Sequence, residues 1–265
     1  MKFTATGNST LGIINGGVTP NLEYSTDGKN WIEWDYSTLT INDGESIYLR
    51  GDNPNGFSLG RYEWSKFVMS GSLACEGNVM SLIGETATEI PCGYCYYDMF
   101  SDCTSLTTAP ELPATTLAEN CYDGMFSCCA SLTTAPELPA TTLTNYCYND
   151  MFAGCSSLTT APELPATTLA DGCYSSMFAG CSSLTSAPEL PATRLVDICY
   201  RSMFHWCSKL NNITMLATDI SAEGCLSNWV YNVSSTGTFK CASGMSTVIF
   251  RGRDGIPDGW TVVEA

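Results

Sequence analysis

The segment Cys121-Tyr-Asp-Gly-Met-Phe-Ser-Cys-Cys129 opens a unit that recurs along the chain at a fixed interval. The pattern Cys-Tyr-x-x-Met-Phe begins at five positions, each 26 residues after the last: Cys95, Cys121, Cys147, Cys173 and Cys199. A period of about 20–50 residues is typical of solenoids, in which a unit buries its apolar face only against its neighbours. The repeat therefore predicts a solenoid over residues 95–224.

The link between these openings is nearly invariant. Residues 105–117, 131–143 and 157–169 all read Ser-Leu-Thr-Thr-Ala-Pro-Glu-Leu-Pro-Ala-Thr-Thr-Leu, and the fourth copy differs only at Ser186 and Arg194. Proline lacks an N–H group, so its recurrence in every unit interrupts any long hydrogen-bond ladder. The link therefore predicts one very short strand in each unit.

The opening segment has an apolar spacing that favours a helix. Four apolar residues follow one another at intervals of four: Leu117, Cys121, Met125 and Cys129. Thr116 and Glu119 form a capping-box pattern at the start of this run. The spacing predicts one apolar face on a helix of about three turns. We therefore expect a short helix and a very short strand in each unit, which makes the fold class α+β.

A second pattern within the units resembles a known family. Phe-x-x-Cys-x-x-Leu-x-x-Ala recurs at residues 100–109, 126–135, 152–161 and 178–187. It resembles the BspA-like leucine-rich repeats of Bacteroides surface proteins and of phages that infect that group, over about half of the chain. The period is longer than the usual form, and Pro-Glu-Leu-Pro stands where an Ile-Pro strand end is expected. The resemblance implies a leucine-rich-repeat fold and a role in adhesion or partner binding rather than catalysis.

The rest of the chain divides around these repeats. Residues 1–74 contain short alternating runs, and Asp27-Gly28 and Asp43-Gly44 are hairpin cues because glycine supplies the positive φ of a tight turn. We expect an N-terminal, Ig-like antiparallel β-sandwich here. The other regions are expected to be a linker and N-terminal cap (75–94), five BspA-like leucine-rich repeats (95–224) and a strand-rich C-terminal cap (225–265).

The charge of the chain is acidic and uneven. The net charge is −16, and residues 67–193 contain 13 Asp or Glu residues but no Lys or Arg. Nucleic acids and anionic membranes are bound through Lys and Arg, so neither is an expected partner. No run reaches the roughly 18 apolar residues of a membrane span, so no membrane insertion is expected. The residues after Met1 are typical of a strand start rather than of a signal peptide.

The fifteen cysteines mostly follow the repeat. Six lie in one column (Cys95, Cys121, Cys147, Cys173, Cys199, Cys225) and five in another (Cys103, Cys129, Cys155, Cys181, Cys207). Free cysteine behaves as a small buried hydrophobe, so we expect reduced thiols that serve packing. With a single histidine in the chain, no metal site and no cofactor are expected. The chain also lacks nucleophile-elbow and phosphate-loop patterns, so we expect no catalytic residues and no enzyme activity.

Two further columns recur once per unit. The carboxylates Glu111, Glu137, Glu163 and Glu189 form either a solvated edge or a site for cations or a basic partner. The tyrosines Tyr96, Tyr122, Tyr148, Tyr174 and Tyr200 are expected in the core or half-buried beside it, although exposed rings in this pattern would stack sugars.

Positions that differ between the units are the remaining candidates for a binding site. The assumed helical phase places them on the outside, where they are either a recognition surface tuned unit by unit or the result of drift. The candidate partner-binding residues are Glu119, Asn120, Asp123, Asn145, Tyr146, Asn149, Asp150, Asp171, Arg201, His205 and Trp206.

These observations favour a non-enzymatic recognition or adhesion protein. It would bind a protein or a surface glycan through a rigid leucine-rich-repeat surface, in an extracellular position on a bacterial cell or a phage virion. The alternative is a structural virion component, such as a tail or capsid decoration protein, docked through the β-sandwich. The sandwich is also the expected contact of any oligomer.

Overall fold

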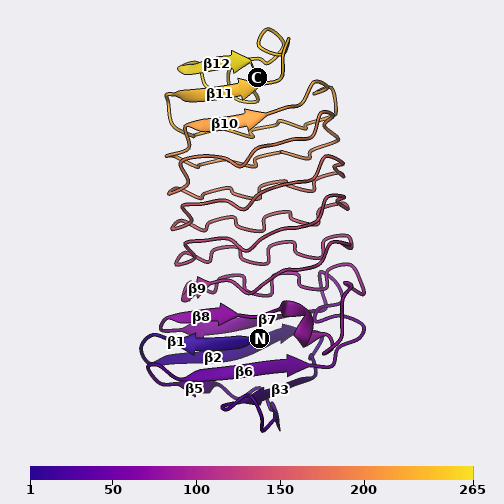
Figure 1. The fold of residues 1–265 in the computed structure, drawn as a ribbon, viewed down its shortest axis with the longest axis vertical. Coiled ribbons are helices and arrows are strands. Elements are labelled where there is room, and N and C mark those ends of the chain that lie inside the picture. The colour runs from indigo at the N-terminus through magenta and orange to yellow at the C-terminus, as the bar shows by residue number, and fades with distance from the viewer. Residues whose placement is uncertain (265) are drawn as a thin grey trace.

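The computed structural model describes residues 1–264. The chain forms an elongated stack that starts in a block of strands, continues through a series of coils and ends in three further strands (Figure 1). One continuous apolar core extends through the whole stack, from Phe3 to Trp260.

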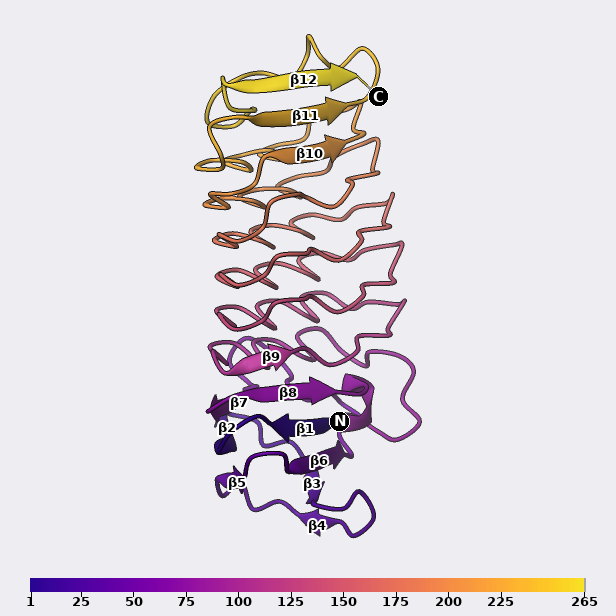
Figure 2. The ribbon, with the colours of Figure 1, turned by 60° about the vertical axis from the view of Figure 1, so that its left-hand side comes forward.

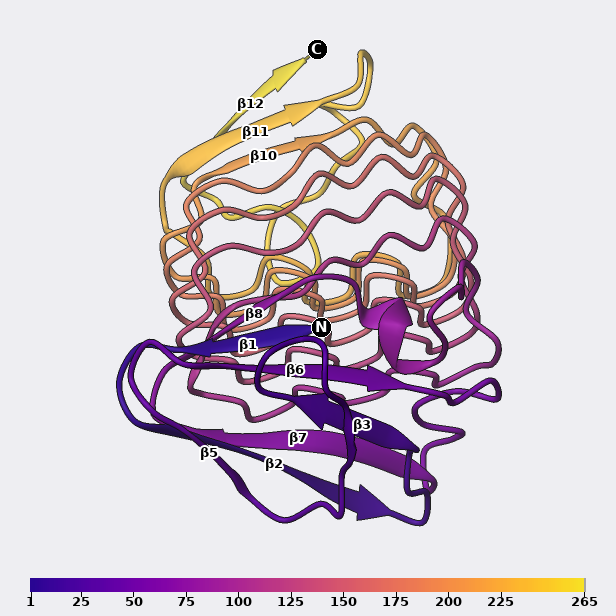
Figure 3. The same ribbon diagram turned by 60° about the horizontal axis from the view of Figure 1, so that its bottom comes forward.

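The N-terminal block is made of two β-sheets, seen from their end of the stack in Figure 3. The strands are β1 (Lys2–Ala5), β2 (Ser9–Gly16), β3 (Leu22–Ser25), β4 (Ile32–Glu33), β5 (Leu39–Ile41), β6 (Ser46–Gly51), β7 (Trp64–Ser70), β8 (Leu73–Glu76) and β9 (Leu106–Thr108). One sheet has the order β4-β3-β6-β1-β8-β9 and the other the order β5-β2-β7. Strand β9 belongs to the first coil and pairs in parallel with β8, so the larger sheet continues into the coils.

The two Asp-Gly cues have different outcomes. Asp27-Gly28 joins β3 to β4, which pair as an antiparallel hairpin. Asp43-Gly44 joins β5 to β6, and these strands lie in different sheets. The hairpin expected at Asp43-Gly44 is therefore wrong. The turn carries the chain from one sheet to the other, and the Asp43 carboxylate accepts a hydrogen bond from the Gly7 N–H at 2.7 Å.

The coils after β9 are built from turns and from hydrogen bonds between neighbouring coils. In residues 120–128, alternate N–H groups donate to the carbonyl three residues earlier, as from Asp123 to Asn120 at 3.2 Å. The N–H groups between them donate to a carbonyl 25 residues later, as from Tyr122 to Cys147 at 3.1 Å. Equivalent residues of successive coils therefore lie side by side, and Figure 2 shows the coils stacked in parallel.

The α+β leucine-rich-repeat solenoid expected from the sequence is wrong. Regular structure within residues 1–264 is nearly all strand, at 27% of residues, and no α-helix is present. The only helical segment in this part of the chain is the 3-10 turn η1 (Val79–Leu82). The expected three-turn helix at residues 117–129 is instead a run of consecutive turns.

The physical reason is the strict interval of four residues. An α-helix has 3.6 residues per turn, so residues exactly four apart drift around it by about 40° at each step. In the coils every fourth residue adopts a left-handed backbone, with φ of 53° at Asn120, 65° at Gly124 and 60° at Cys128. Each such residue closes one turn, so the apolar positions between them return to the interior at a period of four.

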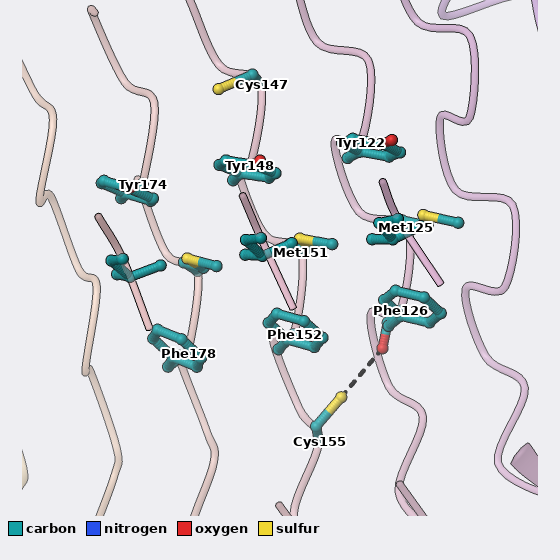
Figure 4. Packing of buried hydrophobic residues seen from close by; sticks show 14 of the residues in the cluster. Tyr122, Met125, Phe126, Cys147, Tyr148, Met151, Phe152, Cys155, Tyr174 and Phe178 are labelled. Carbon is teal, nitrogen blue, oxygen red and sulfur yellow. Dashed lines mark hydrogen bonds between the residues drawn. The ribbon is translucent and has the colours of Figure 1, made fainter. Parts of the chain in front are cut away.

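The interior of the coils holds ladders of identical side chains (Figure 4). Tyr122 stacks on Tyr148 with ring centroids 5.9 Å apart, and Phe126 stacks on Phe152 at 5.6 Å. The five tyrosines of the repeat are at most 2% exposed, which confirms the expected core position of the tyrosine column. Offset stacking of this kind is worth about 0.5–1.5 kcal/mol per pair beyond burial.

The C-terminal end is a parallel three-stranded sheet. It consists of β10 (Asn212–Met215), β11 (Gly237–Cys241) and β12 (Trp260–Glu264), in that order. A strand was also expected at residues 247–250, but these residues form turns. The last residue of the expected cap, Ala265, lies outside the described residues.

Candidate interaction surface

The candidate residues fall into three columns along the outside of the coils, because each coil makes three turns in this region. The first column holds positions 119–120 and their equivalents, the second 123–124 and the third 127–128. Each column has a left-handed residue at its second position. The columns therefore display side chains at fixed intervals, and the three differ in chemistry.

The first column is mostly exposed but contains one buried candidate. Glu119, Asn145 and Asp171 are exposed, as expected. Asn120 is only 6% exposed, so its expected outward position is wrong. The left-handed conformation of Asn120 turns its side chain toward the coil, whereas a helical phase would direct it to solvent. Tyr146 is half-buried and lies over Gly172 of the next coil, where a Cβ atom would meet its ring.

The second column forms an acidic cluster. The Asn149 side-chain amide donates to the Asp123 carboxylate at 2.8 Å and to the Asp150 carboxylate at 3.0 Å. Burial raises the pKa of Asp123 to about 7 and raises the pKa values of Asp98 and Asp150. Within residues 1–264, no group of three or more His, Cys, Asp or Glu side chains is arranged to hold a metal ion. The second column is thus a group of partly buried carboxylates linked through the Asn149 amide.

The third column changes abruptly in the fifth coil. Its left-handed position is occupied by Gly154 and Gly180 in the third and fourth coils, each with φ of 77°. In the fifth coil the same position is Trp206, with φ of 63°. Trp206 is 58% exposed, so most of its indole faces solvent. A large aromatic residue therefore stands where the two preceding coils have glycine.

Trp206 belongs to a group that we call the aromatic–cation patch, made of His205, Trp206, Tyr231 and Arg253. The His205 ring lies between the two other rings, with centroids 6.0 Å from Trp206 and 5.5 Å from Tyr231. The Arg253 guanidinium lies over the Tyr231 ring, 5.4 Å from its centroid. Arg201 is exposed one turn before His205. The patch thus combines exposed aromatic surface with positive charge.

Hydrogen bonds fix the patch to the rigid stack. The Trp206 N–H donates to the Tyr231 carbonyl at 2.9 Å, which places the two residues in adjacent coils. Arg253 donates to the side-chain oxygen of Asn228, and the Asn228 N–H donates to the Asp254 carboxylate at 2.8 Å. Burial and the nearby Arg253 charge lower the pKa of His205, so its ring is neutral at pH 7. The positive charge of the patch therefore comes from arginine.

Tyr231 and Arg253 are site residues that the sequence analysis missed. Tyr231 lies 26 residues after His205, so the repeat interval itself would have identified it. Arg253 belongs to the C-terminal region outside the repeat, and no interval relates it to the patch. Its position depends on the loop between β11 and β12, which brings Arg253 over the Tyr231 ring in the coil after the fifth.

Comparison with known proteins identifies no relative. No protein-family model matches the sequence, and neither a curated protein nor a solved structure is significantly similar to the chain. A search of residues 1–264 for a helix with the length and apolar character of a membrane span finds none. What the aromatic–cation patch offers a partner is therefore set by its own residues, which are exposed aromatic rings and a positive charge.

Proposed function

We propose that this protein is a non-enzymatic recognition module that binds a partner through the aromatic–cation patch. The partner is a protein or a surface glycan, and the place of action is a bacterial surface or a phage virion. Trp, Tyr and Arg are the residues most enriched at binding hot spots, and the patch presents all three on adjoining coils. The rigid stack supports this role because little conformational entropy is lost when a preformed surface binds.

The observation that carries the proposal is the backbone conformation of Trp206. A left-handed conformation costs a residue with a Cβ atom about 1–2 kcal/mol relative to glycine. Because Trp206 is 58% exposed, it gains only part of the roughly 1.5–3 kcal/mol that full burial of a large apolar side chain contributes. The two preceding coils have glycine at the same position, so the fold accepts glycine there. Trp206 is thus poorly explained by stability and well explained by contact with a partner.

Charge supports the same surface. Residues 194–264 contain six of the eleven Lys and Arg residues, whereas residues 67–193 contain none. The patch therefore lies in the part of the coil stack where a partner with an acidic contact surface meets least repulsion. An acidic protein surface and an anionic glycan both meet this requirement.

The test compares Trp206→Gly with unmodified protein. Immobilised full-length chain is probed with a glycan array and with a bacterial cell-envelope extract, and each bound species is then titrated in pure form. We expect Trp206→Gly to weaken binding about thirtyfold, the usual effect of removing a hot spot of 2 kcal/mol, without lowering the melting temperature.

Cys128→Gly is the matched control. Cys128 is the exposed, left-handed residue of the same column three coils earlier, so the replacement is of the same kind on a different part of the surface. This variant should bind as the unmodified chain does. Equal binding by Trp206→Gly, or no ligand from either probe, would exclude the patch as the recognition site.

A structural role through the N-terminal block is the second candidate. Ile14 on β2 and Val68 on β7 are exposed and lie on the same outer face of the smaller sheet, where Gly12 pairs with Val68 and Ile14 with Lys66. These two exposed apolar side chains are a candidate contact for another subunit. Light scattering tests this role by comparing the unmodified chain with the double variant Ile14→Ser/Val68→Ser. The role predicts that the unmodified chain assembles and that the double variant does not.

A further inference from the structure

A different face of the coils is built from the invariant Ala-Pro-Glu-Leu-Pro segment and carries two equivalent grooves. The first has a volume of about 400 Å³ and is lined by residues 109–113 with Pro136, Glu137 and Pro139. The second, of about 470 Å³, is lined by residues 161–165 with Pro188, Glu189 and Pro191. Every lining residue of the first has its counterpart 52 residues later, which is two coils. The repeat itself therefore produces the grooves.

We propose that this proline–glutamate face binds a polyproline II segment that carries a lysine or arginine at every third residue. This inference goes beyond the function proposed for the aromatic–cation patch and does not depend on it. Three independent properties of the face favour this occupant: its charge, its backbone and its period.

The charge of the face favours a cationic partner. One exposed glutamate stands on the face in each of four coils: Glu111, Glu137, Glu163 and Glu189. None of the ion pairs found within residues 1–264 includes any of them. Residues 67–193 contain no Lys or Arg, and the cations of residues 1–66 that reach this stretch pair with Glu76, Glu85 and Asp102 rather than with the glutamates of the face. Cationic side chains of a partner would relieve the repulsion between neighbouring carboxylates.

The backbone of the face disfavours an added β-strand. Strand addition depends on a continuous row of N–H and C=O groups, and two of the five residues in each segment are prolines without an N–H group. A polyproline II chain needs no such row, because its backbone makes no regular hydrogen bonds and stays solvated. The proline rings of a polyproline II chain can also pack against the proline and leucine residues that line these grooves.

The period of the face matches the same conformation. Hydrogen-bonded neighbours in a β-type stack lie about 4.7–4.9 Å apart, so equivalent grooves two coils apart are separated by roughly 10 Å. Three residues of polyproline II span about 9.3 Å. Alternate residues of a β-strand span only about 6.7 Å and lose register within a few coils. Cationic residues at every third position therefore meet the glutamates of alternate coils.

Fluorescence anisotropy with the full chain tests the proposal. The probe is a labelled peptide of repeated Pro-Pro-Arg triplets, long enough to span four coils. Its control is an isomer of the same composition in which all arginines are contiguous. We expect the triplet peptide to bind at least about tenfold more tightly than the isomer, because only the triplet spacing keeps the charges in register.

Two fourfold glutamine variants complete the test. One replaces the four glutamates of the face, Glu111, Glu137, Glu163 and Glu189. The other makes the same change of charge elsewhere, at the exposed residues Glu33, Glu63, Glu89 and Glu223, none of which belongs to an ion pair found within residues 1–264. The first should lose about tenfold or more in affinity and the second should stay within about twofold, with unchanged melting temperatures.

Three results would overturn the proposal: no binding, equal binding of the two peptides, or equal loss in the two variants. The last two would indicate only non-specific attraction to an acidic protein. Trp206→Gly should bind the triplet peptide normally, so failure here and failure of the recognition proposal are distinguishable.

Discussion

The Cys155 thiol donates a hydrogen bond to the carbonyl oxygen of Phe126, in the preceding coil, at a distance of 3.1 Å (Figure 4). The same bond recurs along the stack at 3.0–3.2 Å, from Cys103 to Phe67, from Cys129 to Phe100, from Cys181 to Phe152 and from Cys207 to Phe178. These cysteines are buried, so the thiol fills the interior. The Phe126 carbonyl already accepts the Cys129 N–H within its own coil at 3.1 Å, and the Cys155 thiol adds a second hydrogen bond to it from the next coil. Burial raises the pKa of Cys155 to about 12, which keeps it a protonated donor.

Replacement of Cys155 tests this role. Cys155→Ala should lower the free energy of unfolding by about 1–2 kcal/mol, because it leaves a small cavity and removes one of the two hydrogen bonds to the Phe126 carbonyl. Cys155→Ser keeps a donor and should lose less. Urea unfolding followed by circular dichroism measures both. Cys128→Ala, an exposed cysteine off the column, is the control and should stay within about 0.5 kcal/mol. Equal losses for Ala and Ser would show that only volume matters.

Two residues of the tyrosine column differ in whether the side-chain hydroxyl has a hydrogen-bond partner. The Tyr96 hydroxyl donates to the Val79 carbonyl at 3.3 Å, whereas the buried Tyr122 hydroxyl finds no partner among the described residues. Removal of an unsatisfied buried group relieves a penalty of about 1–3 kcal/mol. Tyr122→Phe should therefore raise the melting temperature, and Tyr96→Phe should lower it. A decrease in both variants would mean that Tyr122 has a partner such as an ordered water.

Gly172 tests the left-handed positions of the first column. Its φ is 62°, and an added Cβ atom would meet the ring of Tyr146. Gly172→Ala should lower the free energy of unfolding by about 1–3 kcal/mol. In a Tyr146→Ala background the steric part disappears, so the same change should cost only about 1 kcal/mol. Identical losses in the two backgrounds, measured by urea unfolding, would contradict the contact.

The acidic cluster makes stability dependent on pH. Burial raises the pKa of Asp123 to about 7, above the unfolded value of about 3.9. Between these values the folded state binds more protons, so its stability is greatest at the acidic end and falls as pH rises through 7. The melting temperature of the unmodified chain should therefore decrease from pH 5 to pH 8.

Asp123→Asn should make this decrease smaller, because an amide does not titrate. The decrease should not vanish, since burial raises the pKa values of Asp98 and Asp150 in the same direction. Asp171→Asn, at an exposed position, is the control and should leave the pH profile unchanged. A profile that is identical in all three proteins would show that Asp123 is not buried in its charged form.

Part of the fold could be predicted from the sequence. The 26-residue interval identifies Tyr122 and Tyr148 as neighbours, and the structure stacks them. The expected helix at 117–129 failed because an apolar spacing of four satisfies the rough criterion for a helix as well as that for a chain of turns. A left-handed residue at every fourth position distinguishes the chain of turns from a helix. Cys128, Tyr146 and Trp206 adopt this conformation, but their residue types do not favour it, so the sequence does not reveal it.

The candidate site was predicted only in part. Arg201, His205 and Trp206 were chosen because they differ between units, and the structure places them on one side of the fifth coil. The outward assignment of Asn120 failed with the helix on which it depended. Arg253 could not be predicted, because only the path of the C-terminal loop brings it to Tyr231.

The sequence by itself determined which residues are equivalent, because a fixed interval of 26 residues makes each coil bury the same side chains against the next. Only the tertiary structure decided how each coil is made and which faces it presents. Hydrogen bonds to the neighbouring coil stabilise left-handed residues that an isolated segment would avoid, and these turns set every outward direction. For that reason Trp206, which the sequence shows only as a difference between the fifth repeat and the others, is the exposed centre of the aromatic–cation patch.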